Sequence, residues 1–181
     1  MKALLDACVI YPTVMREMLL GVARAGLYTP LWSDRILEEW ALAARKLGPQ
    51  GETIARGEVA MAQAAFPNAS VSRHLGLETR LWLPDENDIH VLAAAVSGNA
   101  DVIVTMNAKD FPRNILAEEG LTRLDPDLFL LEYFRSDPQI VGGVGEAVVR
   151  EARRLSGEDW NLRSLMKKAR LPRLGKAMSQ S

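Results

Sequence analysis

The stretch DVIVTMNAKD, residues 101–110, gives the strongest indication of the fold. Its first half is an unbroken β-branched run, which predicts a buried strand over residues 101–105 because such side chains suit a pleated backbone. Its second half becomes polar at Asn107, Lys109 and Asp110. In an open α/β sheet, ligands bind where the strands end in loops of this kind. We therefore expect a binding site in the loop after this strand.

Three further segments fit a strand of the same sheet, at residues 3–5, 27–32 and 121–124. Segments with helical spacing of apolar residues separate and follow them. We expect these helices over residues 12–25, 34–47, 52–65, 90–97, 112–119 and 126–134. Strands that alternate with helices predict a parallel sheet covered by helices on both faces.

The chain changes character after residue 136. The run at residues 141–145, VGGVG, is either a flexible hinge or a helix start, and an amphipathic stretch follows it. We predict one domain over residues 1–136 and a helical extension over residues 137–181. The extension carries a basic tail, which is either a solvated helix face or a contact for RNA phosphate or an acidic partner. Its cations are Arg163, Lys167, Lys168, Arg170, Arg173 and Lys176.

Composition excludes a disordered chain, a collagen-like repeat and a small disulfide-stapled protein. Hydrophobic residues make up 48% of the 181 residues and charged residues 25%, the balance of a globular chain with a substantial core. The formal net charge is -1, so a nucleic-acid partner would need a local basic surface or a metal bridge. The single cysteine, Cys8, cannot form an internal disulfide, which suits a reducing cytoplasm. No segment has the roughly 20 consecutive apolar residues of a membrane span, and we expect no membrane partner.

Four acids stand where the predicted sheet would place a site. Asp6 ends the first strand, Asp110 follows the strand at 101–105, Asp88 begins the Ala-rich helix, and Glu39 lies on the helix after Ser33. Such a cluster of carboxylates needs a cation to stay charged. Ligands that are all oxygen favour Mg²⁺ or Mn²⁺ over zinc, and one or two such ions could activate water for attack on a phosphodiester.

The motifs around these acids resemble those of the PIN-domain ribonucleases, a family that includes the VapC-type toxins of toxin–antitoxin pairs. The resemblance covers about residues 2–135 and follows the family's order. It rests on the segments LLDACV at residues 4–9, WS at 32–33 with ILEE at 36–39, DIHVLAAA at 88–95, and VTMNAKDFP at 104–112. It implies a three-layer α/β/α fold with a parallel sheet and an endoribonuclease site that depends on Mg²⁺ or Mn²⁺.

Carried over position by position, the resemblance makes Asp6, Glu39, Asp88 and Asp110 the catalytic metal ligands. Glu38 is the alternative to Glu39, and Asn107 the alternative to Asp110. Ser33 and Thr105 would hold the carboxylates or a bound water through their hydroxyls. Cys8 stands where many relatives have Asn or Thr, and we expect it to be a small buried side chain.

Simpler roles are open for several of these residues. Asp88 could be an ordinary helix N-cap, Glu39 part of a solvated helix face, and Asp110 the cap of the following helix. His90 is expected to pack or cap rather than bind a metal. Asp101 stands at the amino-terminal end of its strand and should lie at the opposite edge of the sheet. Three further acids are expected to be solvated, namely Asp34, Asp85 and Glu86.

The sequence thus predicts a metal-dependent endoribonuclease that prefers single strands, set in a toxin–antitoxin pair. We expect an antitoxin whose segment offers a basic side chain to the acids, and the family makes a homodimer a further expectation. The main alternative is a PIN-like RNA-binding or scaffold module without catalysis. A phosphoryl-transfer protein of receiver or dehalogenase type is disfavoured, since residues 6–8, DAC, lack the dehalogenase's second acid and no acid pair precedes Asp6.

Overall fold

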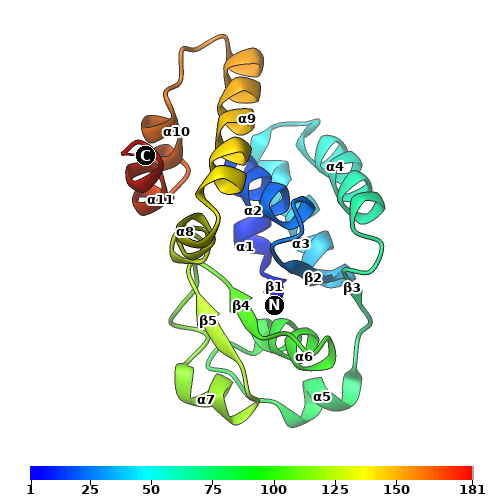
Figure 1. Ribbon diagram of the computed structural model, residues 1–181. Coiled ribbons are helices and arrows are strands. Elements are labelled where there is room, and N and C mark those ends of the chain that lie inside the picture. Colours follow the sequence, from blue (N-terminus) through cyan, green and yellow to red (C-terminus); the bar gives the residue numbers. More distant parts are fainter. Residues whose placement is uncertain (181) are drawn as a thin grey trace. The chain divides into compact units, whose positions relative to one another are not determined.

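The computed structural model describes residues 1–180, which form two compact units. The first unit comprises residues 1–11 and 28–124 and contains every strand of the described chain. The second comprises residues 12–27 and 125–180 and is helical. We call them the sheet unit and the helical unit (Figure 1).

The sheet unit is built on five parallel strands in the order β3-β2-β1-β4-β5. In this order Leu4 of β1 lies opposite Leu31 of β2 on one side and Ile103 of β4 on the other. All three side chains are buried. The strands are β1 (Lys2–Leu5), β2 (Thr29–Ser33), β3 (Ser70–Val71), β4 (Val102–Val104) and β5 (Thr122–Leu124).

The parallel arrangement brings the carboxyl ends of all five strands to one edge of the sheet. The strand order reverses beside β1, because β2 and β3 follow on one side and β4 and β5 on the other. Ligands of open α/β sheets bind at such a reversal. Asp6 comes directly after β1 and Thr105 directly after β4, so both residues lie at this edge, as does Ser33 at the end of β2.

Helices cover both faces of the sheet, which gives the three α/β/α layers that the sequence predicted. α6 (Ile89–Ser97) packs against β1, β2 and β4, and its buried residues surround the helix, as expected for a fully covered position. α3 (Asp34–Ala43) packs beside β2 on the other side, with Ile36, Leu37 and Trp40 buried (Figure 1). The remaining helical segments of the sheet unit are α1 (Ala7–Ile10), η1 (Ala44–Leu47), α4 (Gly51–Ala65), α5 (Leu75–Arg80), η2 (Glu86–Asp88) and α7 (Arg113–Glu118).

The helical unit consists of five helices that pack on one another. α2 and α9 approach so closely that a Cβ added to Gly21 would lie 2.5 Å from Cγ1 of Val144. The buried carboxylate of Asp127 in α8 accepts hydrogen bonds of 2.9 Å from the backbone N–H groups of Arg173 and Leu174, which begin α11. The helices are α2 (Thr13–Arg24), α8 (Pro126–Ser136), α9 (Pro138–Ser156), α10 (Leu162–Lys168) and α11 (Pro172–Met178).

The glycine-rich run at residues 141–145 lies inside α9, so it is neither a hinge nor a helix start. Gly145 faces Met178 of α11, and a Cβ there would collide with the methionine's terminal carbon. Packing therefore outweighs the low helix propensity of glycine. The packing groups α2 and α8 with the helices beyond residue 136, and the domain boundary at that residue stays a prediction.

The sequence predicted four strands and missed the two-residue β3 and the short helices α1 and α5. In the described part of the chain, every helix is too short or too polar to cross a membrane.

Candidate metal centre

Asp6 is held in place by two side chains at the carboxyl edge of the sheet. The hydroxyl of Thr105 donates to its Oδ2 at 2.7 Å, and the Cys8 thiol donates to the same oxygen at 3.1 Å. Both Asp6 and Thr105 are buried. Thr105 in turn accepts from the backbone N–H of Asn107 at 3.0 Å, so the loop after β4 is tied to the end of β1.

Cys8 makes polar contacts, which the sequence did not lead us to expect. Besides its bond to Asp6, its sulfur accepts from the backbone N–H of Met106 at 3.3 Å. Burial, followed by the negative charge of Asp6, raises the pKa of the Cys8 thiol to about 12. The side chain is therefore a neutral hydrogen-bond donor to Asp6 at physiological pH.

Three further acids converge near Asp6. One carboxylate oxygen from each of Asp85, Asp88 and Asp110 lies within 4.8 Å of the other two. Asp85 precedes the 3₁₀ helix η2 and Asp88 ends it. Side chains three residues apart eclipse one another in a 3₁₀ helix, which brings these two carboxylates to the same side. Asp110 comes from the loop after β4. We call Asp85, Asp88 and Asp110 the acid cluster.

The acid cluster is electrostatically crowded in the absence of a cation. The pKa of Asp88 is raised to about 6, mainly by burial and then by the charges of Asp6, Asp85 and Asp110. Asp88 occupies the N-cap position of α6, but within the described chain its side chain makes no capping hydrogen bond. It accepts instead from the Asn107 amide at 3.4 Å. A divalent cation would remove the cost of ionising this carboxyl.

Glu39 lies against a histidine and an arginine rather than within the acid cluster. Its Oε1 is 2.9 Å from Nε2 of the buried His90 and 3.3 Å from Nε of Arg35. Burial pushes the pKa of Glu39 upward, but His90 and Arg35 outweigh it and the pKa is lowered overall. Glu38 pairs instead with Arg56 of α4 on the surface, through two bonds of 2.8 Å. Glu39 is thus the member of the pair that faces the interior, and its role as a metal ligand stays a prediction.

The other predicted residues fall in separate places. Ser33 caps α3, because its hydroxyl oxygen accepts from the N–H of Ile36 at 3.3 Å. Asp101 lies at the opposite edge of the sheet, where it accepts from the backbone N–H of Lys2 at 2.6 Å. Asp110 belongs to the acid cluster, whereas Asn107 reaches it as a hydrogen-bond donor.

Asp85 is the residue that sequence reasoning missed. We expected it only to be solvated, and its place in the acid cluster was not predicted. Its carboxylate also accepts from the N–H and the amide of Asn87, at 2.9 and 3.0 Å. The signal that could have found it is its spacing of three residues from Asp88 within a polar turn. Glu86, between them, is exposed as expected.

Comparison with known proteins places this arrangement in a family. The family model of the PIN domain matches residues 2–109, more than half of the chain. The chain belongs to the PIN domain family. Within this PIN domain the matched range includes Asp6, Glu39, Asp85 and Asp88, and ends one residue before Asp110.

A Mycobacterium tuberculosis protein named "Putative ribonuclease VapC50" is 41% identical over 66 residues. The match covers 34% of this chain and 39% of that relative, so it spans less than half the length of either protein. No solved structure matches this PIN domain.

Proposed function

We propose that this PIN domain is an endoribonuclease that uses Mg²⁺ or Mn²⁺ to hydrolyse phosphodiester bonds of RNA. The observation that carries the proposal is the acid cluster, whose three carboxylates converge within 4.8 Å. Burial, followed by the charges of the neighbouring acids, raises the pKa of Asp88 in this cluster to about 6. The family match and the partial similarity to a protein named as a ribonuclease support the same activity.

The donor set suits a hard divalent cation. Carboxylate oxygens are the ligands that Mg²⁺ and Mn²⁺ prefer, and the group includes neither a histidine nor a thiolate. We propose Asp88 and Asp110 as ligands, with Asp85 as an additional one. The charge of Asp6 raises the pKa of Asp88, so Asp6 is proposed as a ligand of the same site. Glu39, which lies against His90, is proposed as a further ligand.

The bound cation would supply an activated water and stabilise the charge that develops on the scissile phosphate. The protein's own part is positioning. Thr105 fixes the orientation of Asp6 by donating to Oδ2, and Asn107 does the same for Asp88. Such outer hydrogen bonds keep the ligand oxygens turned toward the site when it is empty.

We further propose that the protein is the toxin of a toxin–antitoxin pair, on the strength of the motifs it shares with VapC-type proteins. An antitoxin segment with a basic side chain would neutralise the acid cluster and compete with the metal and the substrate. A homodimer is proposed on family resemblance alone.

The test is cleavage of mixed single-stranded RNA by the purified protein with Mg²⁺, with Mn²⁺ and with EDTA. We expect cleavage that EDTA abolishes and that Asp6→Asn or Asp88→Asn removes, while Glu86→Gln, which deletes an exposed acid of the same turn, retains it. Glu39→Gln tests the remaining predicted ligand, and Glu38→Gln, at the neighbouring position of α3, is its control. Normal cleavage by both aspartate variants would refute the assignment of the site. RNA binding by antitoxin-free protein, with no cleavage under any metal condition, would favour the non-catalytic alternative.

A further inference from the structure

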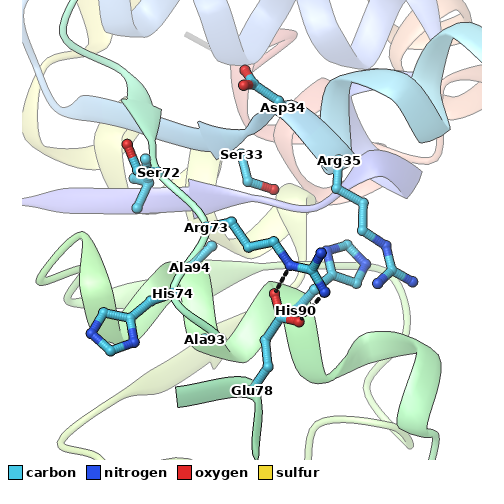
Figure 2. A pocket seen from close by; sticks show the side chains of 11 residues that line it. Ser33, Asp34, Arg35, Ser72, Arg73, His74, Glu78, His90, Ala93 and Ala94 are labelled. Carbon is cyan, nitrogen blue, oxygen red and sulfur yellow. Dashed lines mark hydrogen bonds and ion pairs between the residues drawn. The ribbon is translucent and has the colours of Figure 1, made fainter. Parts of the chain in front are cut away.

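A cavity opens at the edge of the sheet that carries the candidate metal centre, over the ends of β2 and β3. Its volume is about 270 Å³, just below the roughly 300–1,000 Å³ typical of small-molecule sites. Ser33 and Val71, the last residues of these strands, line it, and α6 contributes Ala93 and Ala94 (Figure 2). The cavity is therefore large enough for one flat ring system, and part of its wall is apolar.

The cavity also contains a buried polar side chain that the fold leaves unsatisfied. His90 is 5% exposed and lines the cavity. Neither of its ring nitrogens has a hydrogen-bond partner among the described residues. Nε2 lies 2.9 Å from Glu39, within ion-pair distance but without the alignment of a hydrogen bond. Buried polar atoms are rarely left without a partner, and one explanation is a ligand that supplies it.

Two guanidinium groups complete the cavity wall. Arg73 forms a bidentate pair with Glu78, at 2.9 and 2.7 Å (Figure 2). Arg35 lies 3.3 Å from Glu39. Both side chains are exposed and both are neutralised by an acid. Paired guanidinium groups are weak anchors for a phosphate, but their planar faces remain available for stacking on a base.

Arg35 also connects the cavity to the candidate metal centre. One of its terminal nitrogens donates to the backbone carbonyl of Asn87 at 3.4 Å. Asn87 lies between Asp85 and Asp88 and binds the carboxylate of Asp85. Because β2 neighbours β1 in the sheet, the cavity and the acid cluster lie side by side along one edge.

We propose that this cavity is a nucleobase-binding subsite, which receives one unpaired base of the RNA beside the phosphate that is cleaved. Apolar walls, guanidinium planes and a histidine whose Nδ1 lacks a partner among the described residues are features suited to an extruded base of single-stranded RNA. The inference rests on the proposed ribonuclease function and adds that one position of the substrate is read by the protein.

The test is an abasic scan of binding. A fluorescein-labelled RNA hexamer is titrated with protein in EDTA, which prevents cleavage, and a single abasic site is moved through the six positions. Fluorescence anisotropy gives the affinity of each oligonucleotide. With the wild-type protein, we expect one position at which loss of the base weakens binding by about 5-fold or more, since a stacked base contributes on that order.

Two variants fill the cavity from different sides. Ala94→Leu adds carbons from α6, and Ser72→Leu does so from an exposed loop position where folding is not at risk. In both variants, loss of the base at the sensitive position should weaken RNA binding no more than loss of a base at any other position. Ala60→Leu, at an exposed site on α4, is the matched control and should keep the wild-type pattern.

A flat scan for wild-type protein that cleaves RNA would overturn the subsite and leave the proposed function standing. The same holds if the sensitive position persists in both filled variants, because the base would then be bound outside the cavity. Absence of RNA cleavage under every metal condition would instead remove the proposed function on which the inference rests.

Discussion

Replacing Asp88 by asparagine should stabilise the metal-free protein at neutral pH and abolish its response to divalent cations. Asparagine keeps the shape of the side chain and can still accept the hydrogen bond from Asn107, but it removes one charge from the crowded acid cluster. The variant therefore resembles the protonated form of the wild type.

The magnitude follows from the pKa of Asp88. A rise in this pKa from 3.8 to about 6 corresponds to a folding free energy of about 3 kcal/mol before solvent screening is taken into account. Asp88 is only half-buried, and solvent screening reduces this to about 1 kcal/mol. The change in melting temperature should be about 3 °C for a chain of this size.

The direction of the pKa shift of Asp88 also determines how the stability of the protein depends on pH. Because the pKa of Asp88 is higher in the folded state than in the unfolded chain, the folded state binds this proton more tightly. The favourable contribution is complete below about pH 4 and is lost as the pH rises through about 6. Wild-type protein should thus lose stability over this interval relative to Asp88→Asn.

The assay is thermal denaturation in EDTA from pH 4 to pH 8, repeated with Mn²⁺ at pH 7.5. Saturating metal should raise the melting temperature of the wild type but not that of Asp88→Asn. Glu86→Gln removes the same charge at an exposed position of the same turn and serves as the control. The reasoning fails if Asp88→Asn is less stable than the wild type in EDTA at pH 7.5, or if Mn²⁺ stabilises both equally.

Three further experiments, at Thr105, Gly21 and Cys8, test the hydrogen bonds and the packing. Thr105→Val removes the 2.7 Å hydrogen bond to Asp6 and should lower the rate of RNA cleavage by about 10- to 100-fold. Thr105→Ser should retain most of the cleavage. Equal rates for the two variants would contradict the positioning role of Thr105. Gly21→Ala should destabilise the protein by about 1–3 kcal/mol in urea denaturation, because its Cβ meets Val144, while Gly57→Ala on α4 has open space and should stabilise it by up to about 1 kcal/mol. Cys8, whose pKa is raised to about 12, should react with iodoacetamide at pH 8 far more slowly in the folded than in the unfolded protein, and comparable rates would show that the thiol is not held as described.

The strands and the general position of the site could be predicted from the sequence because their signals are local. The β-branched run ending at Thr105 and the apolar run ending at Asp6 indicate buried parallel strands, and the ends of parallel strands meet at one edge. β3 has two residues and lacks such a signal. Its place beside β2 is set by backbone pairing with Trp32 and Ser33.

The composition of the acid cluster depends on details that local patterns do not specify. Asp85 belongs to it because the turn at residues 86–88 is a 3₁₀ helix, which aligns Asp85 with Asp88. Glu38 and Glu39 are adjacent on α3, and only their partners, Arg56 and His90, show which of them faces inward. Gly145 of α9 similarly packs against Met178, a contact distant in sequence that local patterns do not reveal.

The central claim is that the acid cluster binds a divalent cation, and anomalous X-ray scattering from crystals grown with Mn²⁺ tests it most directly. We expect an anomalous peak bonded to carboxylate oxygens of Asp88 and Asp110, which disappears in crystals of Asp88→Asn. A peak bound only to other residues, or no peak in well-ordered wild-type crystals at saturating Mn²⁺, would contradict the claim.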